Sequence, residues 1–72
     1  MKIGVFDSGL GGLVIAKAIR EAMPSHDIAY LGDTLHVPYG SRSSEAVLKY
    51  TKQSMEFLFK KANCQLIIMA CN

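Results

Sequence analysis

Three apolar runs in this sequence each end on side chains that could move protons or hold a small polar substrate. The residue pairs that follow the runs are Asp7-Ser8, Gly32-Asp33 and Cys71-Asn72. A free thiol has a pKa of about 8.5, so its surroundings can tune it into a base or a nucleophile near neutral pH. If the three runs end at the same place, the sequence predicts proton-transfer or covalent chemistry on a small molecule.

Cys71 is the strongest candidate for a reactive group, although a thiol at the end of a buried strand is more often an inert packing residue. Its position beside Asn72, with Asp7 expected nearby, favours a catalytic role. Cys64 stands at the other end of the same apolar segment, and extended chain would place the two cysteines about 20 Å apart. Because that distance excludes a disulfide, we expect Cys64 to have a structural role.

The turn at residues 7–12 is rich in glycine and precedes a predicted helix. Glycines let a ligand approach the backbone, and the first turn of a helix offers unpaired amide groups to an anion. The spacing fits neither the dinucleotide motif G-x-G-x-x-G nor a phosphate-binding loop with its Lys-Ser/Thr pair. Two interpretations stay equally open: a site for a small carboxylate or phosphate, and a plain strand-to-helix turn.

A loop around residues 38–40 also allows two interpretations. The sequence favours a rigid turn, but Tyr39 between proline and glycine could close over a substrate. His26 and His36 have no companion at metal-ligand spacing, so we expect both to be solvent-exposed and predict no metal site. Asp33 is expected to cap a loop and is given no catalytic role.

These side chains depend on strands and helices that alternate along the chain. The predicted strands cover residues 3–6, 28–31 and 65–70, and the predicted helices cover residues 13–23 and 44–62. Pro24 ends the first helix, Ser43 is the expected N-cap of the second, and Asn63 is its expected left-handed C-terminal residue. The pattern predicts an α/β fold, the βαβαβ start of a doubly wound parallel sheet.

The order of the strands decides which side chains meet. Ligands of open α/β sheets bind beyond the carboxyl ends of the strands, near the point where strand order reverses. With right-handed crossovers, order 2-1-3 puts the helices on opposite faces and the strand before Cys71 about 5 Å from the strand before Asp7. Order 1-2-3 would roughly double that gap. We favour order 2-1-3, because an acid beside a thiol is useful chemistry.

Length and composition limit the classes of protein that fit. The chain has 72 residues, about half of an ordinary domain, so we expect the sheet to be incomplete and the natural protein to be longer. Its net charge is only +2 with scattered basic residues, which disfavours nucleic acid. No apolar run approaches the roughly 20 residues that span a membrane, and Asp7 comes too early for a signal peptide. A cytoplasmic location is the resulting expectation.

Together the motifs resemble the glutamate racemases of the aspartate/glutamate racemase family. The matching stretches are residues 3–12, residues 30–34 with 37–40, and residues 67–72. The resemblance covers the whole chain in order. It departs from the family pattern at Leu13-Val14, where Thr or Ser commonly follows the double glycine, and the family's Cys-Asn-Thr motif is cut after Asn72.

The resemblance implies a cofactor-independent enzyme that interconverts L- and D-glutamate and supplies D-glutamate for peptidoglycan. Family members place one cysteine on each face of the substrate's α-carbon, and Cys71 matches the first of the two. Asp7 matches the residue that assists this thiol and contacts the substrate. The positions that match those holding the substrate's charged groups are Asp7, Ser8, Tyr39, Gly40 and Asn72.

The resemblance also implies that residues 1–72 are the N-terminal part of the first of two α/β domains. The second cysteine and its histidine partner would lie outside this chain, so we expect the isolated chain to be inactive. Family members are often dimeric, which makes a homodimer of the full-length protein an open option. Two alternatives also remain open: a racemase for aspartate or another small acid, and a truncated binding module without catalysis.

Overall fold

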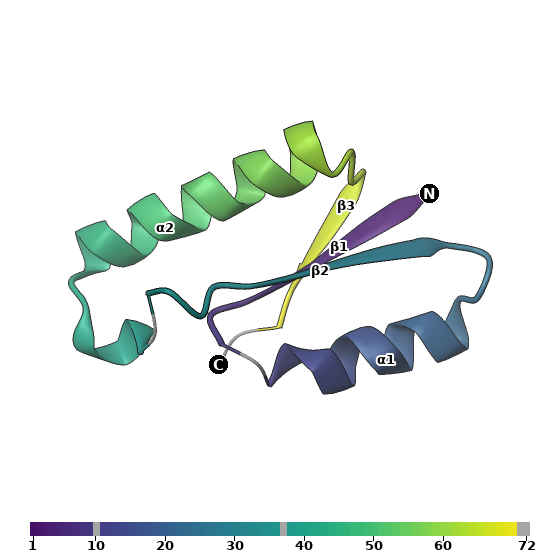
Figure 1. Cartoon of the computed structure of the whole chain (residues 1–72), viewed down its shortest axis with the longest axis horizontal. Helices are drawn as coiled ribbons and strands as arrows, with labels where there is room; N and C mark the ends of the chain where they lie inside the picture. Colours follow the sequence, from purple (N-terminus) through teal and green to yellow (C-terminus); the bar gives the residue numbers. More distant parts are fainter. Residues whose placement is uncertain (10, 37, 71–72) are drawn as a thin grey trace.

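Strands and helices alternate in the computed structural model, which describes residues 1–9, 11–36 and 38–70 (Figure 1). The elements are strand β1 (Lys2–Asp7), helix α1 (Gly12–Ala22), strand β2 (Asp27–Gly32), the 3-10 turn η1 (Tyr39–Ser41), helix α2 (Ser44–Glu56), the π-helical segment η2 (Phe57–Lys61) and strand β3 (Leu66–Met69). All three strands and both helices lie close to their predicted bounds. The predicted α/β class is therefore confirmed.

β1 is the central strand of a three-stranded sheet with the order β2-β1-β3. Both pairings are parallel, and Ile3 lies opposite Ile28 on one side and opposite Leu66 on the other. Helices α1 and α2 lie on opposite sides of the sheet (Figure 1). This arrangement follows from two right-handed crossovers that run in opposite directions, the first from β1 to β2 and the second from β2 back across β1 to β3. The structure confirms order 2-1-3 and excludes order 1-2-3.

The core of the described residues is small and is built around β1. Ile3, Val5 and Phe6 are at most 1% exposed, and Leu58 of η2 reaches the same burial. Phe6 and Leu58 form one buried cluster with Cys64. The position of Cys64 in this cluster agrees with the structural role expected for it.

Local sequence signals correctly predicted where the second helical segment begins and ends. The Ser43 hydroxyl accepts a hydrogen bond from the Ala46 N–H at 3.1 Å, and Asn63 has a left-handed φ of 59°, both as predicted. Between them, the Ala62 N–H donates to the Phe57 carbonyl at 3.0 Å, which widens the last turn into η2. Apolar spacing does not distinguish a π-helical turn from an α-helical one, so the sequence predicted one uninterrupted α-helix.

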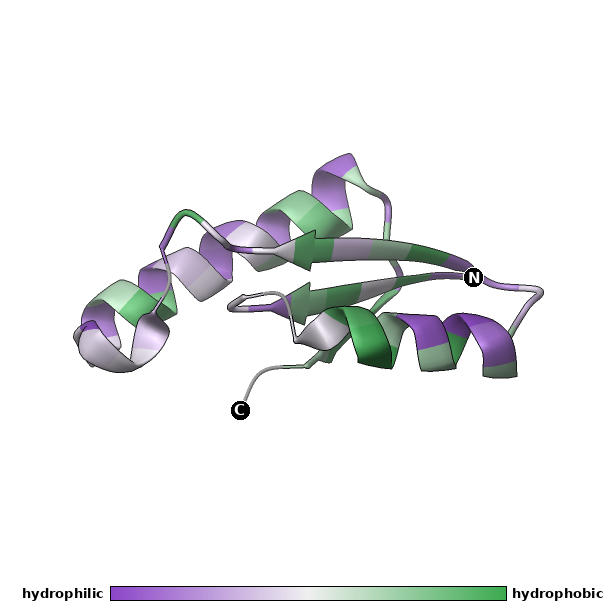
Figure 2. Cartoon of the chain, turned by 60° about the horizontal axis from the view of Figure 1, so that its bottom comes forward, coloured by the Kyte–Doolittle hydropathy of each residue, from purple (hydrophilic) through white to green (hydrophobic). Residues whose placement is uncertain are grey.

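β3 is an edge strand with part of its apolar surface uncovered. Leu66 and Met69 are 47% and 55% exposed, which agrees with the expectation that this sheet is incomplete. The ribbon of α1 is hydrophobic near its start (Figure 2), and Val14 in this part of the helix is 73% exposed. Across the described residues, no helix is both long and apolar enough to cross a membrane.

Candidate active site at the carboxyl edge of the sheet

A cavity of about 520 Å³ opens at the edge of the sheet where the parallel strands end. Its lining residues are Asp7, Ser8, Gly9, Gly11, Ile15, Pro38, Tyr39, Gly40 and Ala70. Four predicted site residues are therefore brought together: Asp7, Ser8, Tyr39 and Gly40. The two others, Cys71 and Asn72, lie outside the described residues. Ala70, the residue directly before Cys71, lines the cavity.

Asp7 is held tightly at the end of β1, where it is 5% exposed. Its Oδ2 accepts a hydrogen bond from the backbone N–H of Gly12, at the start of α1. The unpaired amides and the dipole at a helix N-terminus favour a carboxylate at this place. The glycine-rich turn thus binds an anion that the chain itself supplies. One first-turn amide of α1 is already occupied by Asp7.

The tyrosine of β2 supports the same carboxylate. The Tyr30 hydroxyl lies 3.3 Å from Asp7 Oδ2 and 3.1 Å from the Gly9 carbonyl oxygen, so its proton can go to either acceptor. Sequence analysis missed Tyr30, because a tyrosine inside a predicted strand carries no signal of the side chain it will meet. Only the pairing of β2 with β1 brings the two together.

Two glycines near Asp7 are required by close packing. A Cβ built at Gly12 would lie 2.9 Å from the Asp7 Cβ and 3.1 Å from the Ala70 Cβ. A Cβ at Gly32 would lie 2.5 Å from the Gly9 carbonyl oxygen. Real Cβ atoms do not approach other atoms so closely, so a side chain at either position would displace the turn or the strand end. The turn therefore holds Asp7 in place in addition to connecting the strand to the helix.

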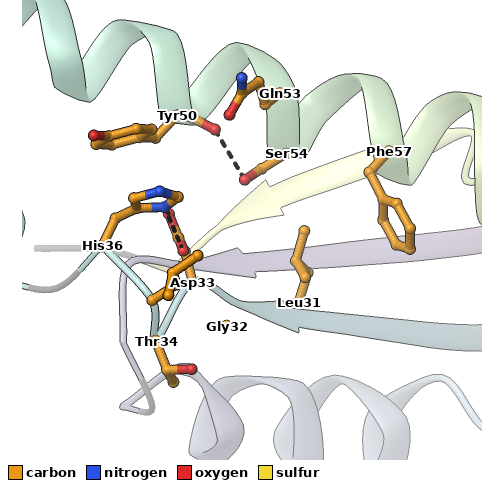
Figure 3. A pocket seen from close by; sticks show the side chains of 10 residues that line it. Leu31, Gly32, Asp33, Thr34, His36, Tyr50, Gln53, Ser54 and Phe57 are labelled. Carbon is orange, nitrogen blue, oxygen red and sulfur yellow. Dashed lines mark hydrogen bonds and ion pairs between the residues drawn. The ribbon is translucent and has the colours of Figure 1, made fainter.

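His36 lies in a network with Asp33, which contradicts the expectation that it is a solvent-exposed loop residue. The His36 Nδ1 lies 2.8 Å from Asp33 Oδ2, and its ring stacks on Tyr50 of α2 with centroids 3.6 Å apart (Figure 3). His26 is also only partly exposed, and its Nδ1 lies 3.0 Å from the N-terminal amino group. An Asp-x-x-His pair in a loop carries no metal-ligand signal in the sequence, so this contact could not be predicted from the spacing of the histidines.

Asp33 joins this network to the wall of the cavity. Its Oδ2 accepts a hydrogen bond from the Tyr39 hydroxyl, and its backbone N–H donates to the Asp7 carbonyl at 2.9 Å. Burial alone would raise the pKa of Asp33, but the hydrogen bonds from Tyr39 and His36 and the charge of His36 lower that pKa below its ordinary value of 3.8. Asp33 is thus a carboxylate at neutral pH, and it organises the loop as expected.

A second, smaller cavity of about 240 Å³ lies between β2, the following loop and α2 (Figure 3). Leu31, Ser54 and Phe57 are among its lining residues. Of the predicted site residues that the structure describes, none lines this cavity. We therefore place the candidate active site at the larger cavity. Within residues 1–9, 11–36 and 38–70, no three His, Cys, Asp or Glu side chains are grouped so that they could hold a metal ion.

Comparison with known proteins supports the resemblance seen in the motifs. No family model matches the chain. The chain is 54% identical over all 72 residues to the glutamate racemase of Aquifex aeolicus, of which it covers 28%. It is 51% identical over 70 residues to the glutamate racemase of Chlorobaculum tepidum, of which it covers 25%. The chain thus spans about a quarter of the length of these curated relatives.

The solved structure of glutamate racemase from Aquifex pyrophilus has the same fold as this chain. The two superimpose with a TM-score of 0.92 at 49% sequence identity, over 99% of this chain and 28% of that structure. A likeness of this size, together with the sequence identities, confirms that the whole chain resembles part of a glutamate racemase.

Proposed function

We propose that this chain, which is similar to glutamate racemases over its whole length, forms one side of the active site of such an isomerase. The single observation that supports this most is the cavity at the carboxyl edge, because Asp7, Ser8, Tyr39 and Gly40 line it together. These residues come from two separate motifs of the resemblance, residues 3–12 and residues 30–34 with 37–40. The reaction we propose is the interconversion of L- and D-glutamate without a cofactor.

Cys71 is the proposed base or acid for one face of the substrate. In the sequence it follows Ala70 directly, and Ala70 lines the cavity. A thiolate would remove the α-proton, and a second cysteine on the opposite face would return one. Asp7, buried beside the cavity, is proposed to orient the thiol and to accept its proton when the thiolate forms.

The remaining residues are proposed to bind the charged groups of glutamate. The Ser8 hydroxyl and the Tyr39–Gly40 wall supply donors and acceptors at the cavity. Asn72, which matches a substrate-binding position of the resemblance, is proposed to add its side-chain amide. An α-proton of an amino acid is a very weak acid, so fixed donors must stabilise the carbanion character of the transition state. Exclusion of water from the closed site strengthens these contacts.

Residues 1–72 are proposed to be the first part of an α/β domain in a two-domain enzyme. The second cysteine and its histidine partner would come from the other domain. We further propose that the enzyme acts in the cytoplasm and supplies D-glutamate for peptidoglycan. We also propose that the full-length protein forms a homodimer. Measuring the mass of the purified full-length protein in solution tests the last point.

The proposal is tested by measuring racemisation of L-glutamate by the full-length protein, with deuterium incorporation at the α-carbon in deuterium oxide as a second readout. Cys71→Ser should nearly abolish both, because a hydroxyl is a far weaker acid than a thiol. Cys64→Ala is the matched control, since Cys64 packs in the core and should not affect turnover beyond any loss of stability. Near-normal racemisation by Cys71→Ser would contradict the proposal.

Two further measurements separate the alternatives. Steady-state kinetics on glutamate and aspartate identify the substrate, and the higher kcat/KM is expected for glutamate. The isolated 72-residue chain should produce no D-glutamate, because one proton-transfer group cannot serve both faces of the α-carbon. Saturable glutamate binding by the full-length protein without exchange of the α-hydrogen would instead support a binding module.

A further inference from the structure

Asp33 stands between two walls of the candidate active site without lining the cavity itself. Its backbone N–H donates to the carbonyl oxygen of Asp7, at the end of the central strand, at 2.9 Å. Its side chain accepts the hydrogen bond of the Tyr39 hydroxyl, on the opposite wall. One residue is thus bonded both to the strand that carries the proposed catalytic carboxylate and to the loop that faces it.

We propose that Asp33 is a positioning residue that holds Tyr39, and with it the 38–40 wall, at the distance from Asp7 that the substrate requires. The inference rests on the proposed function, since it assigns Asp33 to the substrate cavity of that enzyme. Asp33 acts through Tyr39 and does not touch the reacting atoms.

The loop between β2 and α2 contacts the core through Tyr39, which packs against the buried cluster of Phe6, Leu58 and Cys64, whereas the backbone hydrogen bonds around η1 are local. The Arg42 N–H donates to the Tyr39 carbonyl at 3.0 Å, and the Ser41 hydroxyl donates to the Pro38 carbonyl at 3.1 Å. These bonds shape the η1 turn but do not tie it to the sheet. The Asp33–Tyr39 bond does tie it, and a bond between a hydroxyl and an ionised carboxylate is stronger than one between neutral groups.

Asp33 is itself fixed from a second direction. The His36 Nδ1 lies 2.9 Å from its Oδ1 and 2.8 Å from its Oδ2. The His36 ring is stacked on Tyr50, so α2 supports the carboxylate through the histidine (Figure 3). The Arg42 guanidinium carbon lies 5.3 Å from the centre of the Tyr50 ring, which links the end of the loop to the same support. With its own orientation fixed, Asp33 can fix that of Tyr39.

The test is a double-mutant cycle in the full-length enzyme with Asp33→Ala, Tyr39→Phe and both changes together. Each single change should raise the KM for glutamate about tenfold and leave kcat within about twofold, because a displaced wall weakens ground-state and transition-state binding alike. If Asp33 acts through the Tyr39 hydroxyl, the double variant should be no worse than the more affected single variant. The inference is overturned if the increases in KM of the two single variants multiply in the double variant. It is also overturned if Asp33→Ala leaves the KM unchanged.

Asp33→Asn gives a second route if Asp33→Ala does not fold. Asparagine keeps one acceptor for the Tyr39 hydroxyl, so its KM should fall between those of the wild type and Tyr39→Phe; a KM above that of Tyr39→Phe would count against the inference. Asp27→Asn, at the exposed start of β2, the strand that precedes Asp33, is the control and should have wild-type kinetics. A wild-type enzyme that does not racemise glutamate would refute the proposed function, whereas an active wild type with an unaffected Asp33 series would refute only the positioning role.

Discussion

The position of the Asp7 carboxylate depends on neighbouring glycines, which leave space around it. Its carboxylate reaches the first amide of α1 only because Gly12 leaves room for the Asp7 Cβ and for Ala70. Gly12 therefore sets the position of Asp7, the residue proposed to assist the Cys71 thiol. The consequence can be measured as a loss of stability on substitution of Gly12 that substitution of Gly40, which has open space around it, does not share.

Gly12→Ala should lower the free energy of unfolding by about 1–3 kcal/mol, the usual cost of forcing an extra methyl group into a packed site. The new Cβ would lie 2.9 Å from the Asp7 Cβ, in a part of the chain that is buried. Urea unfolding followed by circular dichroism measures the change. Gly40→Ala is the matched control, since no atom lies within 4 Å of a Cβ at Gly40. Equal effects at the two positions would contradict this explanation.

The lowered pKa of Asp33 predicts that the stability of the folded chain depends on pH. The hydrogen bonds and the histidine charge that lower its pKa stabilise the folded chain when the carboxylate is ionised in both states, above its ordinary pKa of 3.8. This stabilisation is lost as pH falls through the lower pKa of the folded state. Asp33→Asn should therefore be less stable than the wild type at neutral pH, and the gap should narrow below about pH 4. Urea unfolding at a series of pH values measures the gap, and a constant gap would rule out this role.

At the level of single elements, α2 shows how a local signal fixes the start of a helix. Ser43 is extended and its hydroxyl accepts the Ala46 N–H, while Glu45 lies in the first turn, where the helix dipole favours a carboxylate. The start of α2 matters for the site because η1, with Tyr39, directly precedes it. A frayed α2 would also loosen Tyr50, on which His36 stacks.

Ser43→Ala should destabilise the chain by about 1 kcal/mol, the typical effect of removing an N-cap hydroxyl. Ser44→Ala, one residue along, is the control, because Ser44 is exposed and is the first residue of the helix itself. Its effect should stay within about 0.5 kcal/mol. Thermal or urea unfolding of both variants gives the comparison. A cap variant as stable as the Ser44 variant would show that α2 is held by packing alone.

At the scale of the whole molecule, stability depends on few side chains. Among the described residues, the largest fully buried side chains are Phe6, Ile3, Leu58 and Val5. Leu58 is the member that comes from a helix, so it joins η2 to the central strand through its contact cluster with Phe6. Domains of this size have total stabilities of roughly 0.05–0.15 kcal/mol per residue, so a single core truncation removes a large share.

Leu58→Ala should lower the free energy of unfolding by about 2–5 kcal/mol through lost burial and the cavity left behind. Leu48→Ala is the matched control, since Leu48 is 55% exposed on the same helical region and its loss should cost less than about 1 kcal/mol. Circular dichroism during urea unfolding measures both. Similar losses for the two variants would mean that the packing around Leu58 does not hold α2 and η2 on the sheet.

Much of the fold could be predicted because its signals are local. Ser43, Pro24 and Asn63 mark helix ends through their own backbone and side-chain chemistry, and the apolar runs mark the strands. The conversion of the last turn of α2 to a π-helix could not be predicted, because residues on one apolar face keep that face with either hydrogen-bond pattern. The exposure of Leu66 and Met69 agrees with the incomplete sheet that the short chain predicted, although composition alone does not reveal which residues of a strand stay uncovered.

The sequence by itself determined the alternation of strands and helices, and it placed Asp7, Ser8, Tyr39 and Gly40 among the candidates for the site. The tertiary structure decided which of these meet, because a cavity forms from segments that only the β2-β1-β3 order brings to one edge. It also brought in Tyr30, Asp33 and His36, whose roles are contacts across the fold. A residue's type fixes what bonds it can make, but the packing of distant segments decides which bonds it does make.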